Sequence, residues 1–460
     1  MIDTEFRASS QLKSFGLNGF PYMLQSLLQE KTTSLTPAYS EKWVATILVA
    51  SVCYLSVLSF LNARGLHVSA ALVGLVEALI FAGCLSIQMP RLPLSTVALS
   101  FCVWAWIIFT WLIRQSPDIK SLRDLIIPLL FLSLGRHVAD VGFANRCLKL
   151  IVGILIAVGL FEVVFTETYA SLFNTFSFYV NLGGIDESAA MFKGQMLTLN
   201  GYRPEGIGRT ILPILLGSHR ASSVLMEPVS LGNFAVILLA WALSKPWPEI
   251  RKAPWLILSA ALLITLCDSR FGLMMSAALI VLRLLPVPML GRLAPTLPFL
   301  ILAIVIGLAS FISGEGDNLL GRIARSGIEL QHFNWALLIG LSGPLPNYGD
   351  MGYAYVLSRF GAPLSMALVI LLFLIPMANP RGVRFRALLV LYLFGSLAIS
   401  GTSIFALKTA GLMWFLFGVL SAAPDGDGEA SSDSHPKNAS VTRVVSRTAN
   451  AVSALKGNQA

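Results

Sequence analysis

The sequence is organised as long apolar runs separated by short polar stretches. Apolar runs close to the length of a membrane span recur from Trp43 to Leu420. A helix of about 20 apolar residues crosses the hydrocarbon core of a bilayer, which is about 30 Å thick. The pattern therefore predicts an all-α protein, a polytopic bundle of membrane-spanning helices.

The boundaries of these runs predict about twelve transmembrane helices. We expect them at residues 43–63, 68–88, 94–114, 119–135, 147–167, 228–244, 253–268, 270–287, 295–313, 352–376, 386–402 and 404–422. The helix at 119–135 differs from the rest because it is short, opens with Arg123 and Asp124 and contains Pro128. It is the candidate for a broken or re-entrant helix, which a bundle tolerates where neighbouring helices satisfy the exposed backbone.

The short loops indicate an orientation by the positive-inside rule, which counts Lys and Arg and largely ignores acidic residues. With both termini in the cytoplasm, the inner loops carry Arg91; Arg136, Arg146 and Lys149; Lys245, Arg251 and Lys252; Arg283 and Arg292; and Arg381, Arg384 and Arg386. We therefore expect a cytoplasmic segment at 1–42, a membrane bundle with its loops at 43–422, and a disordered cytoplasmic tail at 423–460, which is rich in Asp, Ser, Gly and Asn. Residues 1–42 lack the features of a signal peptide.

Composition agrees with this picture. Hydrophobic residues make up 55% of the chain and charged residues only 12%, against about 25% charged in a soluble domain. The formal charge of +9 is spread over short loops, so it reflects topology and indicates no nucleic-acid partner. The five cysteines lie in apolar runs, which favours packing over a zinc site or a disulfide framework.

Two connections are much longer than the others, at 168–227 and 314–351. Both are expected on the side opposite the basic loops, in a periplasm, and loops of such length are usually functional. Their charged residues are Arg203, Glu205, Arg209, Arg220 and Glu227 in the first, and Arg322, Arg325, Glu329, His332 and Asp350 in the second. In the second loop, one apolar helical face predicts an interfacial helix that acts as a lid; it consists of Leu320, Ile323, Leu330, Phe333 and Leu337.

Several of these residues are candidates for chemistry. Glu227 precedes Pro228, where a helix is expected to begin; if the preceding segment is helical too, Arg220 and Glu227 share a face. Arg270 follows Ser269 in a polar break that is either a tight turn, with the arginine reaching the headgroups, or part of a site. Asp350 is either a helix cap or a carboxylate at a ligand site.

Two acidic residues, Glu77 and Glu162, lie inside predicted helices. Charges at membrane depth are costly, so we expect each to form a buried hydrogen bond or, for Glu162, to lie near the membrane interface. Neither of them predicts a proton relay by itself.

The order of these features resembles the Wzy-type polysaccharide polymerase and O-antigen ligase superfamily over residues 40–420. The features are the long first loop, Arg220, the Glu227-Pro228 helix entry, the Ser269-Arg270 break and a second loop that ends in polar residues. The resemblance implies a GT-C-like fold and an inverting, metal-independent glycosyltransferase without a cofactor. It also implies a donor sugar chain on undecaprenyl pyrophosphate, contacted by the arginines that match Arg220 and Arg270.

The resemblance leaves the catalytic base open between Glu227 and Asp350. Ligases of the superfamily have a His-Asn pair before the later helix, whereas this chain has Asn347, Tyr348 and Asp350 there and His332 well upstream. This departure favours a polymerase over a ligase. Accessory roles are expected for Arg203, Arg209, His332 and Tyr348.

Three functions follow as hypotheses: a polymerase of exported polysaccharide, a glycan ligase, and a transporter or flippase of lipid-linked oligosaccharide. The charged loops and the absence of a visible repeat favour the transferases. No Gly-rich phosphate loop or metal cluster is recognisable. The expected partners are the lipid-linked oligosaccharide and membrane lipid, with a chain-length regulator and a flippase.

Overall fold

The computed structural model describes residues 38–92, 94–183, 209–314, 319–349, 351–377, 379–399 and 403–423. Within these ranges the chain is all-helical and has no strands. Most of the predicted tail and of the predicted N-terminal segment lies outside the described residues, as do the loop residues Arg203 and Asp350.

Six helical segments in the described part of the chain are long and apolar enough to cross a membrane. They are α3 (Ala38–Ala63, with the span at Glu41–Ala63), α4 (Ala70–Gln88), α5 (Leu94–Arg114), α7 (Val141–Val164), α15 with α16 (Val287–Leu293 and Leu297–Ala309) and α19 (Gly352–Leu374). Three shorter apolar helices are α11 (Pro228–Ser244), α13 (Trp255–Cys267) and α21 (Leu407–Ala422). The protein is therefore a helical membrane protein.

Three further long helices complete the bundle: α6 (Ile119–Val138), α14 (Arg270–Arg283) and α20 (Pro380–Leu397). Each of the predicted helix ranges overlaps one of the helices named so far. Short α-helices are α8 (Thr166–Phe173), α9 (Thr175–Asn181), α10 (Pro213–Leu216), α12 (Trp247–Lys252), α17 (Leu319–Gln331) and α18 (Trp335–Ile339). The 3₁₀ turns within the described ranges are η2 (Met89–Arg91), η5 (Ser223–Leu225), η6 (Ala294–Thr296) and η7 (Ser403–Phe405).

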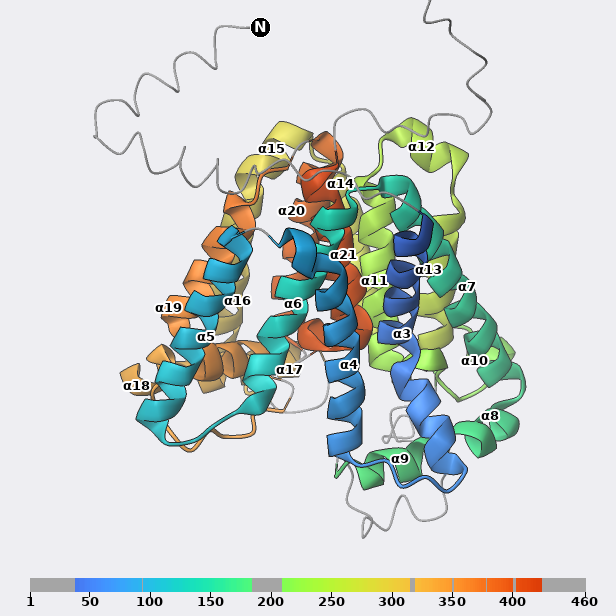
Figure 1. The fold of residues 1–460 in the computed structure, drawn as a ribbon, viewed down its shortest axis with the longest axis horizontal. Coiled ribbons are helices and arrows are strands. Elements are labelled where there is room, and N and C mark those ends of the chain that lie inside the picture. The colour runs from blue at the N-terminus through green and yellow to red at the C-terminus, as the bar shows by residue number, and fades with distance from the viewer. Residues whose placement is uncertain are drawn as a thin grey trace, which may run out of the picture. The chain divides into compact units, whose positions relative to one another are not determined.

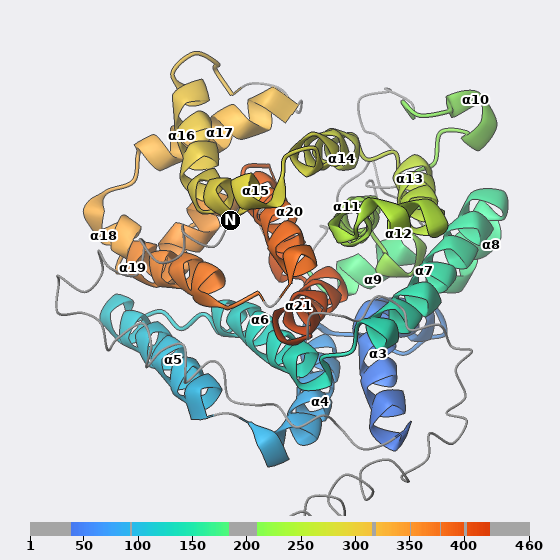
Figure 2. The same ribbon diagram turned by 90° about the horizontal axis from the view of Figure 1, so that it is seen from above.

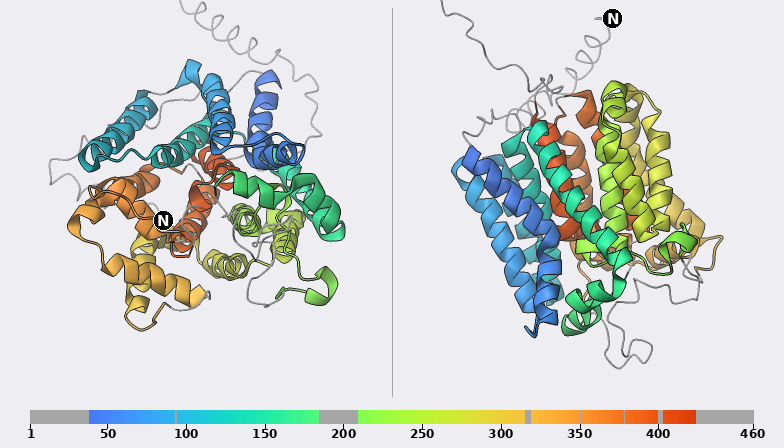
Figure 3. Two further views of the ribbon diagram at one scale, coloured as in Figure 1. Left: turned by 90° about the horizontal axis from the view of Figure 1, so that it is seen from below. Right: turned by 90° about the vertical axis from the view of Figure 1, so that its right-hand side faces the viewer.

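The short helices define two ends of the bundle. Helices α8, α9, α17 and α18 lie at one end, which we call the loop end, and α12 lies at the other, the α12 end (Figure 1). Figure 2 looks at the α12 end and shows α21 among α6, α11 and α20. The loop end, on the left of Figure 3, carries the green α8–α9 segment and the yellow-orange α17–α18 segment over different parts of the bundle.

Helix α6 is continuous from Ile119 to Val138, with Pro128 inside it. The expectation of a broken helix is wrong, and a re-entrant course stays a prediction. Proline removes one backbone donor and crowds the carbonyl one turn earlier, but tight packing along α21 holds the helix together. A Cβ atom at Gly135 would lie 2.1 Å from the Phe415 carbonyl oxygen, and one at Gly418 would lie 2.2 Å from that of Leu132. Small residues allow such backbone contact between membrane helices.

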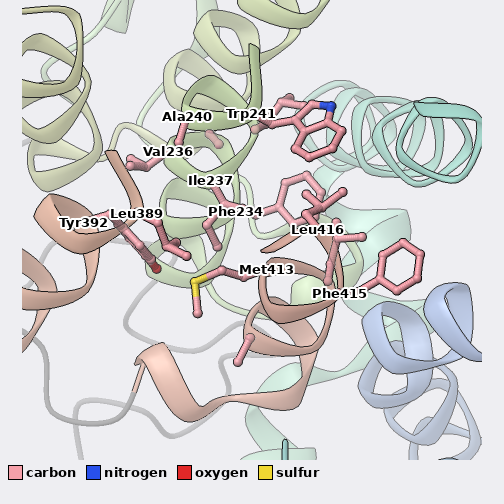
Figure 4. Close-up of a cluster of buried hydrophobic side chains, with 14 of the residues drawn as sticks. Phe234, Val236, Ile237, Ala240, Trp241, Leu389, Tyr392, Met413, Phe415 and Leu416 are labelled. Atoms are coloured by element: carbon pink, nitrogen blue, oxygen red, sulfur yellow. The ribbon is translucent and has the colours of Figure 1, made fainter. Parts of the chain in front are cut away.

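The apolar centre of the bundle is formed by α11, α20 and α21 (Figure 4). All residues of α11 except Val229 are buried, as expected of a helix with neighbours on every side. Trp241 of α11 meets the ring of Phe385 edge-on, with 5.5 Å between the ring centres. Its indole nitrogen donates to the Asn145 side chain at 3.0 Å, so the one polar atom of this large side chain is satisfied.

The predicted lid helix is only partly right. Helix α17 ends at Gln331, so Phe333 and Leu337 do not continue its apolar face. Its buried residues are small, and a Cβ at Gly327 would lie 2.1 Å from the Val305 carbonyl oxygen of α16. Close packing of this kind makes α17 an integral part of the helix bundle.

Candidate functional site

The segment that enters α11 is fixed to the junction between α13 and α14. Asp268 ends α13 in the left-handed conformation, with φ of 48°. Its carboxylate accepts hydrogen bonds from the backbone nitrogens of Thr210 (3.0 Å) and Ile211 (2.8 Å) and from the Thr210 hydroxyl (2.7 Å). The polar break seen in the sequence therefore holds the start of this segment.

Arg209 also belongs to this anchor. Its guanidinium donates to the carbonyl oxygens of Ile211, His219, Thr265 and Leu266, and the residue is buried. A cation at the C-terminus of α13 satisfies carbonyls that the helix leaves without partners. These contacts give Arg209 a structural role. The sequence instead predicts an accessory role at the site.

Glu162, near the end of α7, fixes the middle of the segment. It is fully buried and accepts hydrogen bonds from His219 Nε2 (2.8 Å), from Ser222 N and Oγ (2.8 and 2.9 Å) and from Ser223 N (2.6 Å). The buried hydrogen bond expected for this residue is thus a set of four. A carboxylate with that many donors is well compensated for burial. It holds the His219 side chain before Arg220 and the Ser222–Ser223 backbone after it.

Arg220 lies against the α13–α14 junction, where Arg270 begins the next helix. Arg220 Nε donates to the Cys267 carbonyl oxygen at 3.1 Å. Three residues later, Arg270 is exposed at the start of α14, behind Ser269, whose hydroxyl accepts from Gly272 N at 2.9 Å. The structure therefore brings both predicted pyrophosphate ligands to one junction.

The segment between Arg220 and Glu227 is not an α-helix, so the condition for a shared helical face is not met. Residues 218–226 form a loop that contains only the 3₁₀ turn η5, and Ser223 and Met226 have positive φ. Glu227 itself is extended and directly precedes α11. The two side chains are held by different partners, because Glu162 fixes the backbone between them.

Glu227 is paired with Lys408 of α21. Lys408 Nζ lies 2.8 Å from Glu227 Oε2 and also donates to the Leu225 carbonyl at 2.9 Å. The hydroxyls of Tyr179 (3.0 Å, to Oε1) and Ser230 (2.7 Å, to Oε2) complete the set. Burial alone would raise the pKa of Glu227, but Lys408 and the two hydroxyls outweigh it and lower the pKa. Sequence reasoning missed Lys408, since one lysine near a predicted helix start carries little signal.

A second charged group joins four helices. Tyr54 of α3 donates to Glu77 Oε1 at 2.7 Å, and Arg123 of α6 lies 3.5 Å from Glu77 Oε2. Arg123 also donates to Asp124 at 2.8 Å, and Tyr355 of α19 donates to the other oxygen of Asp124 at 2.6 Å. Charges at membrane depth are expected to pair in this way, but the sequence did not identify their partners.

The two charged groups are neighbours. The charges of both Glu77 and Glu227 act on the Tyr54 hydroxyl, and Glu77 and Glu227 accept from the hydroxyls of Tyr54 and Tyr179 respectively. Together they form what we call the polar layer. Its members are Tyr54, Glu77, Arg123, Asp124, Tyr179, Glu227, Tyr355 and Lys408.

The remaining predicted residues lie elsewhere. His332 is exposed after the end of α17, with Nδ1 2.7 Å from the Ile328 carbonyl oxygen. Tyr348 is 3% exposed and packs against Phe333, with 5.9 Å between the ring centres. Arg203 and Asp350 fall outside the described residues. Of the predicted residues that the structure describes, Arg209, Arg220 and Arg270 lie at the α13–α14 junction.

An apolar groove of about 710 Å³ runs between α3 and α4. Val57, Leu61, Leu79 and Ile80 are among its lining residues, and Tyr54 of the polar layer lines it as well. Because both helices are candidate membrane spans, the groove suits a hydrocarbon chain.

Within the described residues, no group of three or more His, Cys, Asp or Glu side chains is arranged to hold a metal ion. Comparisons with protein-family models, with curated proteins and with solved structures find no match for this chain.

Proposed function

We propose that this chain is a polysaccharide polymerase of the Wzy type in a bacterial inner membrane. It would cross the membrane about twelve times and work on the periplasmic side. It would transfer a glycan chain from undecaprenyl pyrophosphate to a lipid-linked acceptor repeat unit. The observation that carries the proposal is the junction of α13 and α14, where Arg220 donates to the Cys267 carbonyl three residues before Arg270.

The placement of the connecting segments supports the proposed orientation. Helices α8 and α9 of the first long loop and α17 and α18 of the second lie at the same end of the bundle (Figure 1). The basic residues Arg251 and Lys252 belong to α12 at the other end. The positive-inside rule places that basic end in the cytoplasm, so the two arginines would face the periplasm.

The chemistry of these residues suits the reaction. The acceptor hydroxyl oxygen attacks the anomeric carbon of the donor sugar, the bond to the pyrophosphate oxygen breaks, and the hydroxyl proton passes to a carboxylate. The departing pyrophosphate gains negative charge, which guanidinium groups match with paired, charge-assisted hydrogen bonds. Each donor aimed at the leaving group contributes about 3 kcal/mol of transition-state stabilisation in comparable sites.

Glu227 and Asp350 remain the two candidates for the base. The ion pair with Lys408 lowers the pKa of Glu227, which makes it a weaker proton acceptor. Glu227 would therefore act as base only when Lys408 moves away, and otherwise would hold the entrance of α11 in place. The groove between α3 and α4 would take the prenyl chain of a lipid-linked substrate.

A flippase of lipid-linked oligosaccharide is the second candidate function. The charges of the polar layer support it, because transporters also keep paired charges at membrane depth. A glycan ligase remains the alternative within the transferase class. The three functions differ in which intermediate accumulates when the protein is missing.

Deletion of the protein in its native cell tests the proposal. For a polymerase we expect single lipid-linked repeat units to accumulate on the periplasmic face, with loss of polymer. Retained polymer that is not attached to its final acceptor would mean a ligase, and repeat units trapped on the cytoplasmic face would mean a flippase. Complementation with the wild-type chain is the control.

A further inference from the structure

A second cluster of cations lies where α5 ends and α6 begins. Arg359 of α19 forms an ion pair with Asp118, and its guanidinium lies 4.6 Å from the ring centre of Tyr355. Lys120 Nζ lies 5.0 Å from the same ring centre. Arg114 donates to the Ser358 carbonyl oxygen at 3.3 Å. Three cations and one carboxylate thus meet beside the polar layer.

The nearby acidic groups do not balance these cations. The charges of Asp118 and Arg359 both act on Arg114, and those of Asp118, Asp124, Arg123 and Arg359 act on Lys120. Asp124 is already bonded to Arg123 and Tyr355. The cluster of Arg114, Asp118, Lys120 and Arg359 therefore keeps an excess of positive charge.

Buried donors in this cluster lack acceptors. Arg114 Nε and Nη2, Arg359 Nε and the Tyr348 hydroxyl are buried and have no hydrogen-bond partner among the described residues. Arg114 is 7% exposed and Tyr348 3%. The charge of Arg359 acts on both side chains, and the charge of Glu329 also acts on Tyr348. With Asp118 and Glu329 counted against Arg114, Lys120 and Arg359, one positive charge remains in excess. Buried polar groups are normally satisfied, and an arginine can only donate, so the missing partner is an acceptor, most simply an anion.

We propose that Arg114, Lys120, Arg359 and Tyr348 form a second anion site, which binds the phosphate-bearing headgroup of a lipid. Phosphate oxygens accept the paired hydrogen bonds that guanidinium groups donate. The inference rests on the proposed function, because polymerisation uses two polyprenyl-diphosphate substrates at once. The α13–α14 junction would hold one diphosphate and this cluster the other. Tyr355 links the second site to the polar layer through Asp124.

The sharpest test removes one hydroxyl. Binding of undecaprenyl diphosphate to the full-length protein in detergent is measured by native mass spectrometry, and we expect two bound molecules. Tyr348→Phe should weaken one of the two sites by about tenfold, the effect of losing a hydrogen bond to a charged group. Folding should be unchanged, since the hydroxyl has no partner in the described part of the chain. Tyr392→Phe is the matched control, because that hydroxyl is also buried and without a partner.

A second pair of variants tests the charge. Lys120→Gln should weaken the same site, whereas Lys252→Gln in α12, an exposed lysine at the other end, should not. Two further probes test selectivity. Binding of inorganic pyrophosphate would indicate a site for any diphosphate, and binding of phosphatidylglycerol from nanodiscs would indicate a site for any phospholipid. Binding of neither would indicate a site selective for the prenyl diphosphate. If Tyr348→Phe and Lys120→Gln both bind every probe as the wild type does, the proposal of a second site is wrong.

Arg270→Gln separates this inference from the proposed function. If Arg270→Gln loses one bound lipid while Tyr348→Phe and Lys120→Gln lose none, the result supports the junction site and contradicts the second site. The reverse pattern keeps the second site and rejects the junction as a diphosphate ligand. Arg251→Gln, an exposed arginine of α12, is the control for Arg270→Gln.

Discussion

Helix α21 passes through two regions that are built differently. At its start, Lys408 belongs to the polar layer, where it is paired with Glu227 at 2.8 Å. Further along, α21 packs on α6 so closely that no side-chain atom fits at Gly135 or Gly418. In the second region the shape of the two backbones determines the contact, whereas in the first the charges do.

The difference shows which residues serve the fold and which are available for function. The glycines at the α6–α21 contact are accounted for by folding alone, because close helix contact stabilises the bundle. Charged groups at membrane depth cost free energy even when paired, and apolar residues would often serve stability as well. The polar layer is therefore the region whose chemistry points beyond folding. The following variants test this comparison, in order of decreasing effect on stability.

Gly135→Leu should have the largest effect. The new Cβ would lie 2.1 Å from the Phe415 carbonyl oxygen, so α6 and α21 must separate. Overpacking against backbone should cost at least about 3 kcal/mol, and we expect no folded protein in size-exclusion chromatography of detergent extracts. Gly153→Leu is the control, because nothing lies within 4 Å of a Cβ at that glycine. Equal yields of the two variants would contradict the packing argument.

Glu162→Gln should come next. An amide keeps the shape and one acceptor oxygen for the backbone nitrogens of Ser222 and Ser223. Its NH2 group replaces the oxygen that accepts from His219 Nε2 and Ser222 Oγ, so these two hydrogen bonds must reverse or be lost, at about 2 kcal/mol. We expect a lower thermal midpoint and faster proteolysis within 209–227. Glu167→Gln in α8, an exposed residue, should change neither. A stable Glu162→Gln protein with an unchanged cleavage pattern would show that the loop does not depend on this carboxylate.

Lys408→Met should have a smaller effect that depends on pH. Because the pKa of Glu227 is lowered in the fold, its contribution to stability is complete above the ordinary carboxyl pKa and is lost as the pH falls through the lowered value. Without Lys408, burial should raise the pKa of Glu227 toward or above its ordinary value, so the stability lost on acidification should shrink. Partial solvent access of Glu227 limits the cost to about 1–2 kcal/mol at neutral pH.

Thermal unfolding between pH 3 and 8 measures this shift. The double variant Glu227→Gln with Lys408→Met should show none of the pH dependence that Glu227 contributes, because no titrating carboxyl remains at that position. A Lys408→Met curve parallel to the wild type at every pH would argue against the ion pair.

Arg270→Lys should have the smallest effect on stability and a large one on activity. Arg270 is exposed, so we expect a change within about 0.5 kcal/mol. Lysine keeps the charge and loses the paired donors, which should reduce polymer formation by about tenfold to a hundredfold. Polymer length and amount on gels measure it, with Arg251→Lys as control. Normal polymer from a correctly inserted Arg270→Lys protein would reject its role at the pyrophosphate.

The sequence alone determined the class of this protein and the positions of its helices. The length of apolar runs is a local property, so each predicted range overlaps a helix of the structure. Helix starts are also local: Pro228 opens α11, and Ser269 caps α14. The same local reasoning failed at α6, because Pro128 lowers helix propensity while the distant α21 restores the helix through packing.

Only the tertiary structure decided which charges meet. Lys408 reaches Glu227 across 181 positions of the chain, and Tyr355 reaches Asp124 across 231. Such pairs depend on which helices are neighbours and at what depth each side chain lies, and apolar periodicity contains neither. The same limit explains Arg209, whose partners are backbone carbonyls at the end of α13. A carbonyl left free at a helix end leaves no trace in the sequence of the residue that binds it.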